Sequence, residues 1–191
     1  MDTAELKGAV ESLVFVSETP LRAERIAEVL EVEKGRVLES LRVLTEEYAG
    51  RGAGITLVEV AEGFQFRTRP EFAEWVRRLG KGRPFRFSRA ALETLAIVAY
   101  RQPVTRAEIE YLRGVDSGGV LKTLLDKRLV KILGKKDVPG RPMIYGTSRE
   151  FLELFTLRNL SELPTLKEFS ELPPEAVDGG ESSSEADSPP A

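Results

Sequence analysis

An internal repeat is the feature that most constrains this sequence. At an offset of 83 residues, the stretch PLRAERIAEVLEVEKGRVLESL (20–41) aligns with PVTRAEIEYLRGVDSGGVLKTL (103–124). The alignment keeps the leading proline and the spacing of the apolar residues that follow it. Each stretch also comes after an apolar run typical of a helix. Such self-similarity indicates two copies of one supersecondary unit, and therefore two domains.

The second copy predicts a helix, a helix-turn-helix and a β-hairpin, in that order. Thr105 and Glu108 match the capping-box pattern at the start of a helix, and Gly114 is a stop signal for the same helix. After a short turn, a third helix with an apolar stripe is expected. Two strand-like runs follow, LVKILG (129–134) and MIYGT (143–147). This order of elements is that of a winged helix.

The loop between these two runs matches a known turn. Val138-Pro139-Gly140-Arg141 fits a type II β-turn, which favours proline at its second position and glycine at its third. In the first copy, strands are expected at 54–60 and 64–68, and a closing helix at 69–80. The expected fold is therefore mainly α with small β-hairpins (α+β), built as two tandem winged-helix domains.

Composition sets the expected boundaries and excludes several classes of protein. We expect domains at 1–80 and 88–163, a linker at 81–87, and a disordered acidic tail at 164–191, where Pro, Ser, Gly and acid dominate. The longest apolar run is too short to span a membrane, and the N-terminus does not resemble a secretory signal. These features predict a cytoplasmic protein.

The sequence offers no assembled catalytic set. It contains no cysteine and no histidine, which removes the usual nucleophile–base pairs and the commonest metal ligand. The glycine-rich stretches do not match a phosphate-binding loop. We therefore expect no enzyme activity, no cofactor and no metal.

DNA binding is the alternative that the charge distribution raises. Residues 81–160 hold 16 Lys and Arg against 8 Asp and Glu, a net charge of +8. Winged helices commonly place the third helix in the major groove, so a transcriptional regulator is a second hypothesis. The third helix, however, offers few of the side chains that read bases, and its counterpart in the first domain carries several glutamates.

The second domain resembles a known family. AYRQPVTRAEIEYLRGV, followed at this spacing by GKKDVPGRPMIYGT, is similar to segregation and condensation protein ScpB. The resemblance implies a tandem winged-helix subunit of the bacterial SMC–kleisin condensin. Such a subunit forms a homodimer through its N-terminal domain, binds the kleisin ScpA, and supports chromosome condensation and segregation during cell division. It reaches the SMC protein through the complex, contacts DNA only weakly or non-specifically, and is nucleoid-associated.

Two sets of contact residues follow as expectations. The kleisin contact is expected at Tyr100, Arg101, Gln102, Pro103, Arg106, Asp137, Pro139, Arg141 and Tyr145. The dimer interface is expected along one stripe of the first helix, at Leu6, Val10, Leu13 and Val14. For several of the predicted kleisin-contact residues, a purely structural explanation also stays open. Pro139 is a turn former, Tyr145 suits half-buried packing, and an ion pair with Asp137 would also explain Arg101 and Arg106.

Overall fold

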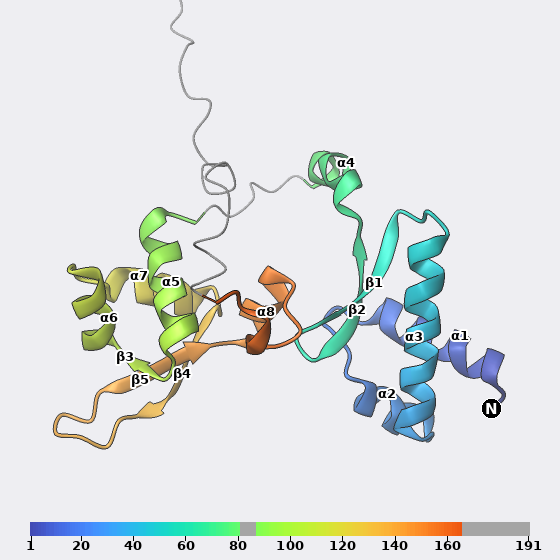
Figure 1. Cartoon of the computed structure of the whole chain (residues 1–191), viewed down its shortest axis with the longest axis horizontal. Coiled ribbons are helices and arrows are strands. Elements are labelled where there is room, and N and C mark those ends of the chain that lie inside the picture. Colours follow the sequence, from blue (N-terminus) through green and yellow to red (C-terminus); the bar gives the residue numbers. More distant parts are fainter. Residues whose placement is uncertain (81–86, 166–191) are drawn as a thin grey trace, which may run out of the picture. The chain divides into compact units, whose positions relative to one another are not determined.

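The computed structural model describes residues 1–80 and 87–165; most of the expected linker and tail lies outside these ranges. The first repeat folds as three helices, a hairpin and a short closing helix (Figure 1). Its elements are α1 (Thr3–Val16), α2 (Ala23–Leu30), α3 (Lys34–Gly50), β1 (Ile55–Val60), β2 (Gly63–Thr68), η1 (Pro70–Phe72) and α4 (Ala73–Leu79).

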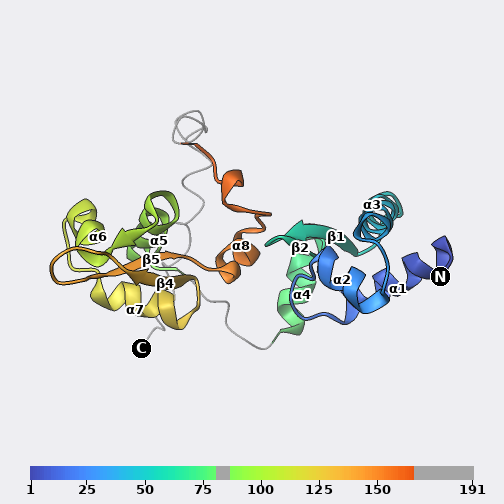
Figure 2. The same ribbon diagram turned by 90° about the horizontal axis from the view of Figure 1, so that it is seen from below.

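The second repeat has the same order of elements (Figure 2). It contains α5 (Arg89–Arg101), β3 (Val104–Thr105), α6 (Arg106–Arg113), α7 (Gly118–Asp126), β4 (Val130–Lys135), β5 (Met143–Thr147) and α8 (Arg149–Phe155), followed by the 3-10 turn η2 (Leu160–Glu162). Its sheet is antiparallel in the order β3-β5-β4. The expected fold class, α+β with tandem winged helices, is confirmed. The domain boundaries and their separate roles remain predictions.

The internal repeat is visible in the strand pairing. In the second domain, Val104 pairs with Tyr145 to add a short third strand to the wing. In the first domain, Leu21 occupies the equivalent place and bridges Phe64, with backbone hydrogen bonds of 2.9 Å in both directions. Each proline that begins a repeated stretch therefore precedes a short extended segment, which ties the helix-turn-helix to its hairpin.

The wing loop of the second domain is the turn that the sequence predicts. The amide of Arg141 donates a hydrogen bond to the carbonyl of Val138 at 2.9 Å, and Gly140 has φ +83°. Glycine adopts this conformation without steric cost, because it has no Cβ. The loop is therefore a compact turn that closes the hairpin between β4 and β5.

The core of the first domain lies between α1 and α3, on the inner face of the hairpin. Leu6, Val10 and Val14 point from α1 into this core, where they meet Leu41 and Leu44 of α3. Helical spacing of 4 residues puts the three α1 side chains on one face. That face is covered within the domain, which bears on the expected dimer interface.

Gly63 provides the first prediction, because it begins β2 directly against the chain at Pro20–Leu21. A Cβ at Gly63 would lie 2.9 Å from the Pro20 carbonyl carbon and 3.0 Å from Leu21 backbone atoms. Backbone cannot move aside as a flexible side chain can, so we expect Gly63→Ala to destabilise the first domain by about 1–3 kcal/mol. Urea unfolding measures this change.

Gly8→Ala is the matched control. A Cβ at Gly8 meets nothing within 4 Å, and the residue lies inside α1. Alanine is the better helix former, so this variant should gain up to about 1 kcal/mol of stability. If Gly63→Ala unfolds at the same urea concentration as the parent chain, the close approach of the two backbones is not a constraint.

Candidate functional site at the second helix-turn-helix

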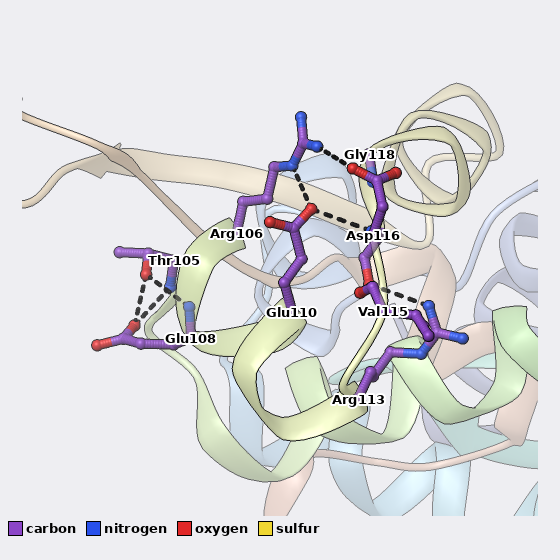
Figure 3. A network of polar contacts seen from close by, with 9 residues as sticks. Thr105, Arg106, Glu108, Glu110, Arg113, Val115, Asp116 and Gly118 are labelled. Carbon is purple, nitrogen blue, oxygen red and sulfur yellow. Dashed lines mark hydrogen bonds and ion pairs between the residues drawn. The ribbon is translucent and has the colours of Figure 1, made fainter.

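Helix α6 begins at a complete capping box (Figure 3). The amide of Glu108 donates to Thr105 Oγ1 at 3.3 Å, and the amide of Thr105 donates to Glu108 Oε2 at 2.7 Å. The Thr105 hydroxyl donates to the same carboxylate oxygen at 2.8 Å. These bonds satisfy backbone donors that have no partner inside the helix, so the start of α6 is fixed in place.

The other oxygen of the same carboxylate reaches the wing. Lys136 Nζ donates to Glu108 Oε1 at 2.6 Å. The Lys136 hydrogen bond, followed by the bonds from Thr105, lowers the pKa of Glu108 to about 2 from its ordinary 4.5. Glu108 therefore stays ionised at neutral pH, where it joins the helix start to the loop that follows β4.

The turn between α6 and α7 is closed by a second set of polar contacts, which Figure 3 also shows. Arg106 donates to Glu110 Oε1 at 2.6 Å and to Asp116 Oδ2 at 2.5 Å. The amide of Ser117 donates to Glu110 Oε1 at 3.0 Å. The Ser117 bond and Arg106 together lower the pKa of Glu110. An ion pair with Asp137 was one explanation left open for Arg106; the structure instead pairs Arg106 with Glu110 and Asp116, within its own helix-turn-helix.

The glycine pair at the start of α7 has two different explanations. A Cβ at Gly118 would lie 2.8 Å from the guanidinium of Arg106, so glycine leaves room for the Arg106–Asp116 pair. A Cβ at Gly119 would meet nothing within 4 Å, and that position is exposed. The group that packs closely against Gly118 is therefore the Arg106 side chain of the same domain.

Gln102 has a structural role at the proline corner. Its Oε1 accepts from the Thr147 amide at 2.8 Å, and its Nε2 donates to the carbonyl of Ala99 at 3.2 Å. A Cβ at Gly146 would lie 2.6 Å from Gln102 Oε1, so glycine is needed beside it. Gln102 thereby links the end of α5 to β5, and the polar atoms of its side chain are used inside the domain.

An open groove of about 460 Å³ lies beside this corner. Its lining is mainly apolar and comes from the end of α5, β3 and the outer face of α6. The lining residues are Arg101, Pro103, Val104, Ala107, Glu108, Tyr111 and Leu112. Tyr111 is 87% exposed and Leu112 is 48% exposed. Large apolar side chains that remain exposed around a groove are typical of protein-interaction sites.

The structure separates the expected kleisin-contact residues into three groups. Arg101 and Pro103 line the groove, and Tyr100 is partly exposed beside them. The second group, on the wing loop, is exposed and consists of Asp137, Pro139 and Arg141. The third group is engaged within the domain: Gln102 and Arg106 make the bonds described above, and Tyr145 is only 9% exposed. A part in the kleisin contact stays a prediction for all nine residues.

The groove also contains residues that the sequence analysis did not single out. Ala107, Tyr111 and Leu112 belong to α6, the first helix of the helix-turn-helix. The spacing of Ala107 and Tyr111 could have predicted this face. The two residues are four apart in the helix, and they lie on a different face from buried Ile109. A face that is apolar but lies away from the core is a candidate contact surface.

The expected dimer stripe on α1 needs a correction. Leu6, Val10 and Val14 are at most 1% exposed and belong to the core of their own domain, and Leu13 packs partly against that core. A second copy cannot reach the three buried side chains. The large apolar side chains of α1 that are exposed belong to its last two residues, Phe15 and Val16. The stripe is therefore an intradomain contact, and an interface of this domain has to use other residues.

Two further findings bear on the class of protein. Across residues 1–80 and 87–165, no cluster of three or more acidic side chains has a geometry that could hold a metal ion. Within the same ranges, no helix is long and apolar enough to cross a membrane. The polar residues of the candidate site instead bond one another, and its open surface is apolar. The fold defines a tandem winged-helix protein, and the groove is its candidate site for a protein partner.

Comparisons with known proteins identify the family. The family model described as segregation and condensation complex subunit ScpB matches residues 8–166. Segregation and condensation protein B of Syntrophotalea carbinolica is 64% identical over 161 residues, which cover 84% of this chain and 82% of that protein. The chain therefore belongs to the ScpB family, and the resemblance seen in the sequence is confirmed. These relatives give no support to a transcriptional regulator.

Solved structures of the same family are also similar. ScpB from Mycobacterium tuberculosis is 39% identical, with a TM-score of 0.41, and the match covers 81% of this chain and 97% of that chain. A crystal structure of a dimer of the ScpB N-terminal domain with an ScpA peptide matches 40% of this chain and 96% of that chain, at 29% identity and a TM-score of 0.38.

The ion pair between Lys136 and Glu108 gives the second prediction. In Lys136→Met, the pKa of Glu108 should rise from about 2 towards its ordinary 4.5, because the largest cause of the lowering is removed. A carboxyl ¹³C NMR titration measures this. Lys135→Met is the matched control, because Glu108 bonds Lys136 and not its neighbour. A Glu108 pKa that stays near 2 in Lys136→Met would contradict the assignment.

The same pKa has a consequence for stability against acid. The folded-state pKa is lowered, so the stabilisation from Glu108 is fully present above pH 4.5 and is lost as the pH falls from 4.5 towards 2. In Lys136→Met, the stabilisation from Glu108 should be lost completely at a higher pH than in the parent chain. Below pH 4, the free energy of unfolding should therefore change less steeply with pH.

Proposed function

We propose that this chain is the non-catalytic subunit of an SMC–kleisin complex that binds the kleisin ScpA as a homodimer. In this role it supports chromosome condensation and segregation during cell division, in the cytoplasm and in association with the nucleoid. It meets the SMC protein through the complex. Membership of the ScpB family supports this proposal. The groove beside α6 supplies a surface for the kleisin.

The observation that carries the kleisin contact is the exposed apolar lining of this groove. Tyr111 and Leu112 stand at its rim, and Pro103 and Val104 form part of its floor. Tyrosine is among the residues that most often anchor protein–protein contacts. An extended or helical kleisin segment with apolar side chains would fill the groove. Arg101 would lie beside this segment, where it would pair with an acidic side chain of the kleisin.

The third helix of the second domain is poorly equipped to read DNA. Its exposed positions include Gly119, Lys122, Thr123 and Asp126. Base reading relies mostly on Arg, Asn and Gln at such positions, and a carboxylate repels the phosphate backbone. In the first domain, exposed Glu39 and Glu46 of α3 flank Arg42 and form ion pairs with it. Specific DNA recognition is therefore a weaker proposal than a protein contact.

A non-catalytic role agrees with how the acidic residues are used. Glu108 bonds a helix start and Lys136, and Glu110 bonds Arg106 and the Ser117 amide. In each case the lowered pKa has an ion pair or a backbone hydrogen bond as its cause. A general acid or base at neutral pH would need a pKa nearer 7. These carboxylates stabilise the domain instead.

The third prediction tests the groove. Tyr111→Ser combined with Leu112→Ser should weaken ScpA binding by roughly tenfold or more, which is the typical effect of removing interface anchors. Isothermal titration of the full chain with ScpA of the same organism gives the affinity. Both side chains are exposed, so the thermal midpoint should stay nearly unchanged.

Leu154→Ser is the matched control, since Leu154 is a similarly exposed leucine on α8 of the same domain. It should leave ScpA binding unchanged. Unaltered ScpA affinity in the Tyr111→Ser, Leu112→Ser variant would show that the kleisin does not use this groove.

A further inference from the structure

Helix α4 presents an apolar face that the first domain does not cover. Trp75 is 60% exposed and Leu79 is 85% exposed, and Phe72 and Val76 are also exposed. Trp75, Val76 and Leu79 belong to α4, where their spacing keeps them within an arc of about 100°, and Phe72 ends the 3-10 turn η1 directly before the helix. A helix this short is not stable by itself, and an uncovered apolar stripe is the mark of a contact surface.

The start of α4 is held firmly on its domain. Arg69 Nη2 donates to the carbonyls of Tyr48 and Ala49 at 2.7 and 2.9 Å, where α3 ends. A cation at this end also complements the dipole of α3. The ring of Phe72 lies against Gly54, where a Cβ would be 3.7 Å from two of its ring atoms. The face of α4 is therefore presented from a fixed base.

The charges beside this face make the helix self-complementary. Glu71 lies in the 3-10 turn η1, and Arg78 lies in the last turn of α4, where it forms an exposed ion pair with Glu74 of the same helix. An exposed pair of this kind contributes little to stability, so Arg78 can exchange Glu74 for a carboxylate of a partner. Glu71 stands at the beginning of the segment and Arg78 at its end. When two copies pack antiparallel about a twofold axis, the same edges meet in opposite directions. In the register that pairs the apolar side chains, Glu71 of each copy lies two residues, or about 3 Å along the axis, from the position opposite Arg78 of the other, within reach of the long arginine side chain.

The apolar side chains show the same symmetry. In the antiparallel arrangement, Phe72 of one copy lies opposite Leu79 of the other, and Trp75 and Val76 meet at the centre. We propose that α4 is the contact through which two copies of this chain pair. This proposal rests on the proposed homodimer and names its surface. A C₂ interface requires a surface that is complementary to itself, and the order of residues in 71–79 provides one.

Trp75 reports on this contact directly, because it is the only tryptophan of the chain. Its emission maximum should shift to longer wavelength as the full chain is diluted, since dissociation exposes the ring to water. Two short helices bury less area than a standard interface, so the midpoint is expected on the order of micromolar. Light scattering at the same concentrations should show the mass falling from dimer to monomer.

A charge exchange distinguishes self-pairing from any other use of α4. Glu71→Lys alone and Arg78→Glu alone should each weaken the dimer by roughly tenfold, because two attractions become two repulsions. An equimolar mixture of these two variants should restore pairing, as should the variant that carries both changes. Glu5→Lys, at an exposed acidic position of α1, is the control and should leave the dimer unaffected.

The outcomes separate this proposal from the proposed function. A parent chain that is monomeric at all concentrations would overturn both the homodimer and the role of α4. A dimer that persists through the single charge changes, with unchanged Trp75 emission on dilution, would overturn the role of α4 alone. Loss of ScpA binding in these variants, with the dimer intact, would assign the face to the kleisin and likewise overturn the proposal.

Discussion

The carboxylate of Glu108 joins three parts of the second domain. One of its oxygens accepts two hydrogen bonds from Thr105 and so fixes the start of α6, and the other accepts from Lys136 of the wing. A helix start, a short strand and a hairpin loop are thereby held at one point. The groove lies on the outer face of this assembly, where Glu108 itself is part of the lining.

The same arrangement decides which surface remains for a partner. Arg106, Glu110 and Asp116 bond one another across the helix-turn-helix, so the charged groups that flank α7 are already paired. A charged group that is paired within the domain contributes less to phosphate binding, since its pair would have to be broken. The ring of Tyr111 is 87% exposed, and burying this apolar surface against a protein is favourable. The fold thus directs binding towards the outside of α6.

Local signals in the sequence predicted more of this structure than long-range ones did. The capping box at Thr105 and the turn around Gly140 depend on residues that are close in the chain, and both were confirmed. The stripe at Val10 was correctly recognised as apolar, but periodicity does not say which neighbour covers it, and α3 does. The partner of Arg106 depended on the geometry of the α6–α7 turn, which sequence spacing does not specify. The outer face of α6 was missed for the same reason.

Salt dependence of binding tests the central claim most directly, namely that the second domain recognises a protein and does not read DNA. Lys135→Glu with Arg141→Glu removes exposed wing cations and leaves Lys136 on Glu108. Affinities for ScpA and for DNA are measured for the parent chain and this variant between about 50 and 200 mM salt, a range over which phosphate binding changes strongly. We expect ScpA binding that is tight, nearly independent of salt and retained in the variant. Tight, sequence-selective DNA binding by the chain alone, falling steeply with salt and lost in the variant, would contradict the claim.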